Sequence, residues 1–330
     1  MLASLLAPHI TGRYDVTIVP IALPTPLVTS LLVHSPWITS DDDTNSETSI
    51  FHDLSSSSSS STIPPDPGRG RRWCFVQIGQ QISTGVGFVP FGLGRKTFYE
   101  AKLEIPYLQL GPLVRARTSS SRAETTETGT GTGTRSTREE EDETRQRQRQ
   151  RGPPPPSFLT YKHTVLFSSH LMAFSSQQVS GLGNSHRVGF KVDDDRRGTY
   201  QAEGYLSVKP TATETTTTTT KWQVETIKDG FESWFVGSNT GSGATRFHTR
   251  DLEPPRVRPT LLHVRIHLPT LTGLDPDAVR RLVGNDNDND NDRGERQGFD
   301  DDEGWYDVVG VEGWDLSVET TMEAKNLVDL

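Results

Sequence analysis

The sequence has little that would cross-link the chain or anchor it in a membrane. Cys74 is the only cysteine, so no disulfide can form within the chain. No run of about 18 apolar residues is present, which excludes a typical transmembrane helix. The apolar run at residues 1–10 has no preceding Lys or Arg, which argues against a secretory signal peptide. We therefore expect a soluble, cytoplasmic protein with no membrane partner.

Hydrophobic residues are also scarce, at 32% of the 330 residues, but they are clustered. Four polar, low-complexity tracts separate the clusters, at about residues 39–71, 116–156, 211–220 and 285–302. Such tracts bury too little apolar surface to offset their chain entropy, so we predict that they are disordered insertions. Because longer loops add little closure entropy, the insertions fit within a single domain spanning residues 1–330.

Between the tracts, apolar and polar residues alternate, which is typical of strands with one buried face. In residues 97–108, for example, Glu100 shares the polar face with Lys102 and Glu104. The predicted strands are residues 13–21, 73–82, 97–108, 161–167, 187–192, 200–208, 262–268 and 314–323, and the predicted short helices are residues 27–33, 171–179 and 222–235. This mainly β (α+β) pattern favours a barrel or sandwich with a few helices at its edges.

Three motifs resemble ligand sites but lack a required feature. Residues 92–97 resemble a phosphate-binding loop, but Arg95 separates the last glycine from the lysine. The Asn-Asp repeat lacks the turn glycine and the final glutamate of a calcium-binding loop. His263 and His267 would lie about 13 Å apart on a strand, too far to bind one metal ion. We therefore predict no cofactor and no metal site, and we interpret Cys74 as a core thiol.

Several blocks, in this order along the chain, resemble the acetoacetate decarboxylase superfamily. They are ITGRYDVTI at residues 10–18 followed by LVTSLL at 27–32, FYEAKLEIP at 98–106, VLF at 165–167 with SQQVSGLG at 176–183, and the region 231–263. The resemblance implies a cone-like, closed antiparallel β-barrel around a mostly apolar pocket. In that family a pocket lysine of lowered pKa attacks the ketone of a β-keto acid, and the iminium accepts the electrons released as carbon dioxide leaves.

The resemblance implies that this chain retains some of the family's pocket residues and lacks others. Glu100 matches the glutamate of the family's aromatic–Glu strand, and Gln178 falls where the family often has a glutamate. The paired family lysines fall at Asn184 and Ser185, neither of which can form a Schiff base. Lys191 is the nearest lysine and the candidate substitute nucleophile, although its strand pattern places it away from the hydrophobic side.

Three functions follow, in order of preference. The first is a barrel that binds a small organic acid, ketone or apolar ligand without Schiff-base decarboxylation, its interior having no amine able to bond to a ketone. The second is a decarboxylase or other lyase that uses another residue in the same pocket. The third is an interaction or scaffold protein acting through its insertions, with a barrel that is only structural. Independently of these three, Glu100 is either a pocket residue or an ordinary polar-face residue beside Lys102 and Glu104. The net charge of −9 argues against nucleic-acid partners, and self-association stays open.

Overall fold

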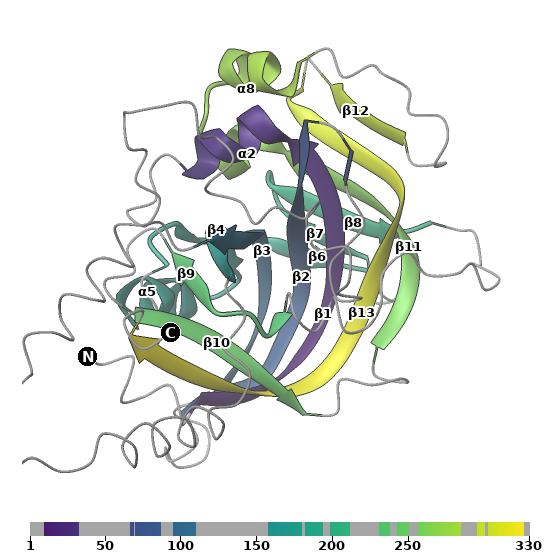
Figure 1. The fold of residues 1–330 in the computed structure, drawn as a ribbon. Helices are drawn as coiled ribbons and strands as arrows, with labels where there is room; N and C mark the ends of the chain where they lie inside the picture. The colour runs from purple at the N-terminus through teal and green to yellow at the C-terminus, as the bar shows by residue number, and fades with distance from the viewer. Residues whose placement is uncertain are drawn as a thin grey trace, which may run out of the picture.

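The computed structural model describes about half of the chain, and most of the described residues are in strands (Figure 1). The described ranges are 10–32, 67–68, 70–86, 95–109, 158–179, 182–193, 199–211, 231–237, 243–250, 257–284, 296–300 and 303–326. The predicted insertion at 116–156 lies outside these ranges, as do most of 39–71 and 211–220. The predicted insertion at 285–302 is too long, because residues 296–300 form a strand.

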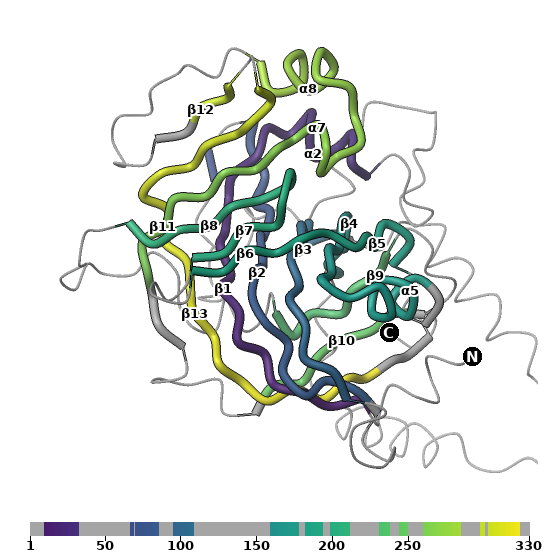
Figure 2. Tube along the Cα trace, turned by 180° about the vertical axis from the view of Figure 1, so that it is seen from behind, coloured from purple at the N-terminus to yellow at the C-terminus, as the bar shows by residue number. Residues whose placement is uncertain are grey.

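Seven strands pair into a closed ring, which Figures 1 and 2 show from opposite sides. In order around the ring they are β1 (Ile10–Pro24), β2 (Arg71–Val86), β3 (Arg95–Gln109), β4 (Phe158–Phe167), β9 (Phe235–Gly237), β10 (Gly243–Arg250) and β13 (Trp305–Asn326). The pairing of β13 with β1 closes the ring. The mainly β prediction is confirmed, but the pairing is not antiparallel throughout, because β4 and β9 run parallel.

The sheet continues beyond the ring as a second layer. From β13 it passes to β11 (Val257–His267), β8 (Leu206–Pro210), β7 (Tyr200–Ala202) and β6 (Phe190–Val192), while β12 (Arg296–Asp300) pairs with β13 and β5 (Ser185–Arg187) with β4. The largest apolar cluster joins outward side chains of β1, β2 and β3, such as Ile21, Val76 and Leu103, to Val208 and Val264 of this layer. The main core therefore lies outside the ring, between its wall and the second layer.

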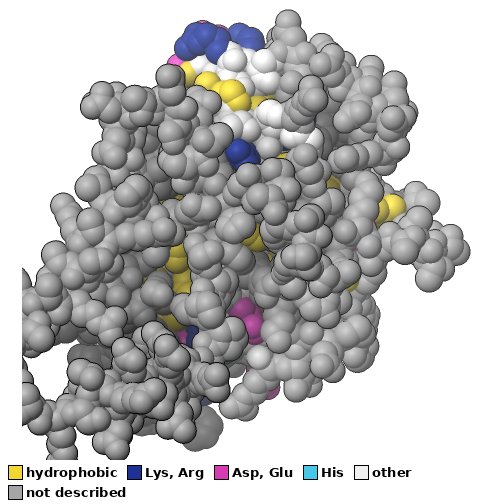
Figure 3. Space-filling view, viewed as in Figure 1, with side chains coloured by type: hydrophobic (Ala, Val, Ile, Leu, Met, Phe, Trp, Pro, Cys, Tyr) yellow, Lys and Arg dark blue, Asp and Glu magenta, His cyan; other side chains and the backbone are white. Residues whose placement is uncertain are grey.

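Short helices flank the strands, as predicted for the edges. They are α2 (Thr25–Leu32), α5 (His170–Val179), α7 (Leu268–Thr272) and α8 (Pro276–Val283). The α8 helix begins where the Asp275 side chain accepts hydrogen bonds from two backbone N–H groups of the first turn, and its N-terminal Pro276 is suited to that position. Figure 3 shows basic side chains at the top of the molecule, where Figure 1 places α8. None of the helices that the structure describes is long and apolar enough to cross a membrane.

Three predicted elements differ from the structure. Residues 187–192 divide between β5 and β6, and residues 200–208 form the β7–β8 hairpin, whose turn places Gly204 at a φ of 76°. The predicted helix at 222–235 lies outside the described residues up to residue 230, and Phe235 begins strand β9. Turns this short are hard to recognise when alternation continues on both sides of them.

Strands β1 and β2 approach each other closely at Gly79, where a Cβ atom would overlap with the backbone of Asp15 and Val16. We expect Gly79→Ala to lower the free energy of unfolding by on the order of 1–3 kcal/mol, the usual cost of overpacking. Gly298 has open space around its Cα, so Gly298→Ala should change it by less than about 0.5 kcal/mol. Urea denaturation of both variants tests this expectation, and equal effects would contradict it.

Candidate functional site

Strand β3 turns its charged face toward the interior of the ring. Its apolar residues Ala101, Leu103 and Ile105 are fully buried in the outer core, against the second layer. Because side chains alternate along a strand, Glu100 and Lys102 must point to the opposite face, where each is only 4% exposed. The face that the sequence marks as polar is therefore the inner face of the ring.

Two lysines and two glutamates form one buried network inside the ring. The Lys102 Nζ lies 2.5 Å from the Glu100 Oε1, and on the neighbouring strand β4 the Lys162 Nζ lies 3.3 Å from the Glu104 Oε1. Gln77 of β2 connects the pairs, because its Nε2 donates to Glu104 at 3.1 Å and its Oε1 accepts from Lys102 at 3.5 Å. The network gives each lysine a carboxylate partner and holds both amines in place.

Aromatic rings complete the surroundings of the two amines. The Lys162 Nζ lies 3.5 Å from the ring centroid of Phe235, and the Lys102 Nζ lies 5.3 Å from that of Tyr14. Both amines lie near Phe247, at 4.9 Å for Lys162 and 5.5 Å for Lys102. Since Tyr14 is on β1 and Phe247 on β10, the lysines reach across the interior of the ring.

Burial has a large effect on the acid–base behaviour of these groups. It lowers the pKa of Lys102 well below its ordinary value, and the neighbouring Lys162 lowers it further, while Glu104 acts in the opposite direction. Burial also lowers the pKa of Lys162, and Glu104 again acts in the opposite direction by raising it. Burial raises the pKa of Tyr14, so that its phenol stays protonated. A lysine of lowered pKa offers more of its free amine, the nucleophilic form, at neutral pH.

Two buried polar atoms in the interior have no hydrogen-bond partner among the described residues. One is the Glu100 Oε2, the carboxylate oxygen that does not contact Lys102. The other is the Trp314 Nε1, an indole N–H in the same apolar cluster as Tyr14. Buried polar atoms are normally paired, so these two atoms are exceptions to the usual pairing.

Of the predicted site residues whose side chains the structure describes, only Glu100 has its side chain in the interior of the ring. Lys191, on β6, is 70% exposed and forms an ion pair with Glu203 at 2.9 Å. Gln178 belongs to α5, but its side chain lies outside the described part of the structure. Ser185 is buried and donates its hydroxyl to the Leu182 carbonyl. The interior therefore does not bring Lys191 together with Glu100.

The expectation that the interior contains no amine is wrong, because Lys102 and Lys162 are both inside the ring. The sequence placed Lys102 on a polar face, and polar faces of strands usually contact water. In this fold the second layer covers the apolar face instead, so the charged face is enclosed.

Cys74 and the two histidines have structural roles, whereas residues 92–94 and the Asn-Asp repeat lie outside the described residues. Cys74 is buried in the outer core, which raises the pKa of its thiol, as expected for a core residue. His263 contacts Asp307 at 2.8 Å, and the His267 side chain accepts a hydrogen bond from the Thr270 N–H at the start of α7. The described residues contain no group of three or more side chains placed to bind a metal ion.

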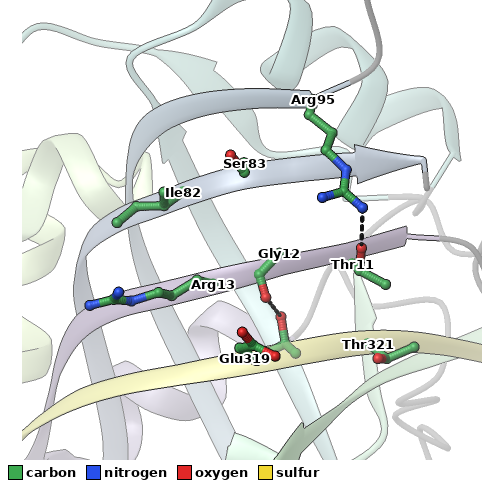
Figure 4. A pocket seen from close by; sticks show the side chains of 9 residues that line it. Thr11, Gly12, Arg13, Ile82, Ser83, Arg95, Glu319 and Thr321 are labelled. Carbon is green, nitrogen blue, oxygen red and sulfur yellow. Dashed lines mark hydrogen bonds between the residues drawn. The ribbon is translucent and has the colours of Figure 1, made fainter. Parts of the chain in front are cut away.

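A pocket of about 450 Å³ lies on the outer face of the ring (Figure 4). It includes Arg13, Arg95 and Glu319 and several threonines. Arg13 already contacts Asp15 at 3.1 Å, and Arg95 donates to Thr11 at 3.2 Å. The pocket does not include either buried lysine, so it is separate from the interior network.

The interior ion pairs predict a specific pattern of stability. Lys162→Met should lower the free energy of unfolding by about 3–5 kcal/mol, because it leaves the buried Glu104 without its cation. Combining it with Glu104→Gln should recover most of this loss. Lys191→Met removes an exposed ion pair and should cost less than about 1 kcal/mol. If chemical denaturation shows Lys162→Met to be as mild as Lys191→Met, the buried pairing is not as described.

Comparisons with known proteins give no close relative. No protein-family model and no curated protein matches the sequence. Two solved structures match, both of the enduracididine biosynthesis enzyme MppR. The complex with pyruvate is 8% identical with a TM-score of 0.39, and the complex with the condensation product of pyruvate and imidazole 4-carboxaldehyde is 9% identical with a TM-score of 0.38. Each match covers 96% of this chain and 89% of that chain, but TM-scores this low do not assign a family.

Proposed function

We propose that the chain is an enzyme of lyase type that forms an imine between the Lys102 amine and a carbonyl compound inside the ring. The observation that carries this proposal is the position of Lys102: a 4%-exposed amine beside a carboxylate, with a lowered pKa. Strongly shifted ionisable groups cluster at functional sites, because catalysis needs nucleophiles that are reactive near neutral pH.

A role in stability explains the four buried charges less well than a role in chemistry does. A buried ion pair gains little over apolar residues of the same volume, because removing two charges from water costs about as much as their attraction returns. A sheet that needed only a filled interior would be served by apolar side chains at Glu100, Lys102, Glu104 and Lys162. Their chemistry is therefore the better explanation for their presence.

The network supplies each group that imine formation needs. Glu100, 2.5 Å from the Lys102 Nζ, takes the proton of the ammonium and leaves a free amine. The amine attacks the carbonyl carbon to give a carbinolamine, and Glu100 returns the proton as water leaves. The product is an iminium on Lys102, which withdraws electrons from the neighbouring carbon and makes a bond to that carbon easier to break. Lys162 and Gln77 hold the geometry of the network.

The alternatives have less support. Non-covalent binding depends on an interior without an amine, and Lys102 lies in that interior. A scaffold role rests on the insertions at 116–156 and elsewhere, which lie outside the described residues.

The imine can be trapped directly. Full-length protein incubated with acetoacetate, or with its uncharged methyl ester, and then with cyanoborohydride should gain one adduct whose mass matches the reduced imine. Peptide mapping should place it on Lys102, and Lys102→Arg, which keeps the positive charge but cannot form the imine, should abolish it.

Lys191→Arg is the matched control, because it makes the same change at an exposed lysine. It should leave the Lys102 adduct intact. If neither carbonyl compound modifies Lys102 faster than it modifies Lys191, the proposed chemistry is contradicted.

A further inference from the structure

We infer that the interior site is built for an uncharged ketone or aldehyde, and that a carboxylate on the substrate is selected against. The inference rests on the proposed imine chemistry at Lys102 and deepens it by naming the substrate class. It follows from the charge balance of the interior network and from the aromatic rings around the amines.

The formal charges of the described interior residues sum to zero. Among the residues that the structure describes, the buried Lys and Glu side chains are two of each: Lys102 and Lys162, Glu100 and Glu104. Moving a proton from Lys102 to Glu100 leaves this sum unchanged. His163, also buried, hydrogen bonds to Thr164, whose hydroxyl donates to the Leu271 carbonyl, so that contact belongs to the side facing α7 and not to the network.

Imine formation with an uncharged carbonyl compound preserves the balance. The ammonium of Lys102 and the carbonyl compound give an iminium and one water molecule, so one positive charge stands beside Glu100 before and after the reaction. An oxo acid instead brings a negative charge that neither lysine is free to neutralise, since each already has a carboxylate within 3.3 Å. An unpaired charge in a buried site is costly, because little solvent is present to stabilise it.

The aromatic rings around the amine also disfavour a carboxylate on the substrate. The face of an aromatic ring carries negative potential, so it attracts cations and repels anions. The Lys102 Nζ lies 5.3 Å from the Tyr14 ring centroid and 5.5 Å from that of Phe247. An iminium at this atom keeps both cation–π contacts, whereas a carboxylate next to it would face the same rings unfavourably.

Two compounds that differ by one negative charge and one methyl group test this inference: 4-oxopentanoate and its methyl ester. Each is incubated with the full-length protein and cyanoborohydride, and the rates of modification of Lys102 and of the exposed Lys191 are followed by peptide mapping. Dividing the Lys102 rate by the Lys191 rate removes the intrinsic reactivity of each compound. We expect the ester to give a ratio about tenfold higher than the acid, or about 1.4 kcal/mol.

A charge variant tests the cause. Glu104→Gln leaves the network with one excess positive charge, so the preference for the ester should shrink or reverse. Asp277→Asn, at an exposed carboxylate that pairs with Arg280 and with neither lysine, should leave the preference unchanged. The comparison on the unaltered protein stands even if Glu104→Gln folds poorly. Equal ratios, or a higher ratio for the acid, would overturn this inference and leave the imine proposal in place. Modification of Lys102 by neither compound would remove both.

Discussion

The apolar layer on the outside of β1, β2 and β3 is the constraint on which the site depends. It buries Ala101, Leu103 and Ile105 completely, and the alternation of the strand then sends Glu100 and Lys102 to the inside of a closed ring. Charges enclosed in this way are tolerable only when they are paired. The structure meets that condition within β3, where Lys102 pairs with Glu100, and between β3 and β4, where Glu104 pairs with Lys162. Gln77 of β2 connects the two pairs. Burial of Lys102, and then the neighbouring Lys162, lowers the pKa of its amine, which connects the packing of the fold to its proposed chemistry.

Much of the fold could be predicted from the sequence, because the long strands carry clear alternation. The strands β1, β2, β3 and β13 are all longer than predicted but occupy the expected places. Strand β9 has three residues, too few to show an alternating pattern. In β10, Phe247 lies between Arg246 and His248, and the strand mixes small, polar and aromatic residues. The α8 helix could have been recognised, since Asp275, Pro276 and Gly284 are typical signals of its two ends. The closure of the ring depends on pairings between distant segments, which no local pattern reveals.

The site was only partly predictable. Glu100 matches a family motif and Lys102 lies two residues away, but the polar face of a strand usually contacts water, so the sequence does not indicate that this face is enclosed. Lys162 depends on a β-bulge: the register of β4 against β3 shifts between Lys162 and Thr164, so His163 is an extra residue. Without that shift, alternation from Val165 would turn Lys162 outward and His163 inward. A bulge of this kind is set by how two strands pair, so the sequence of β4 alone does not indicate which of the two residues faces the interior.

The most direct test of the account is the protonation of Lys102 itself. NMR of protein labelled at the lysine side chains, with the Lys102 signal assigned by its loss in Lys102→Arg, would follow that amine through a pH titration. The account predicts a midpoint well below the ordinary lysine value of 10.5, because burial and the neighbouring Lys162 disfavour the ammonium. A midpoint at or above 10.5 would show that the ion pair with Glu100 dominates, and Lys102 would then be a structural cation with no free amine to offer a carbonyl group.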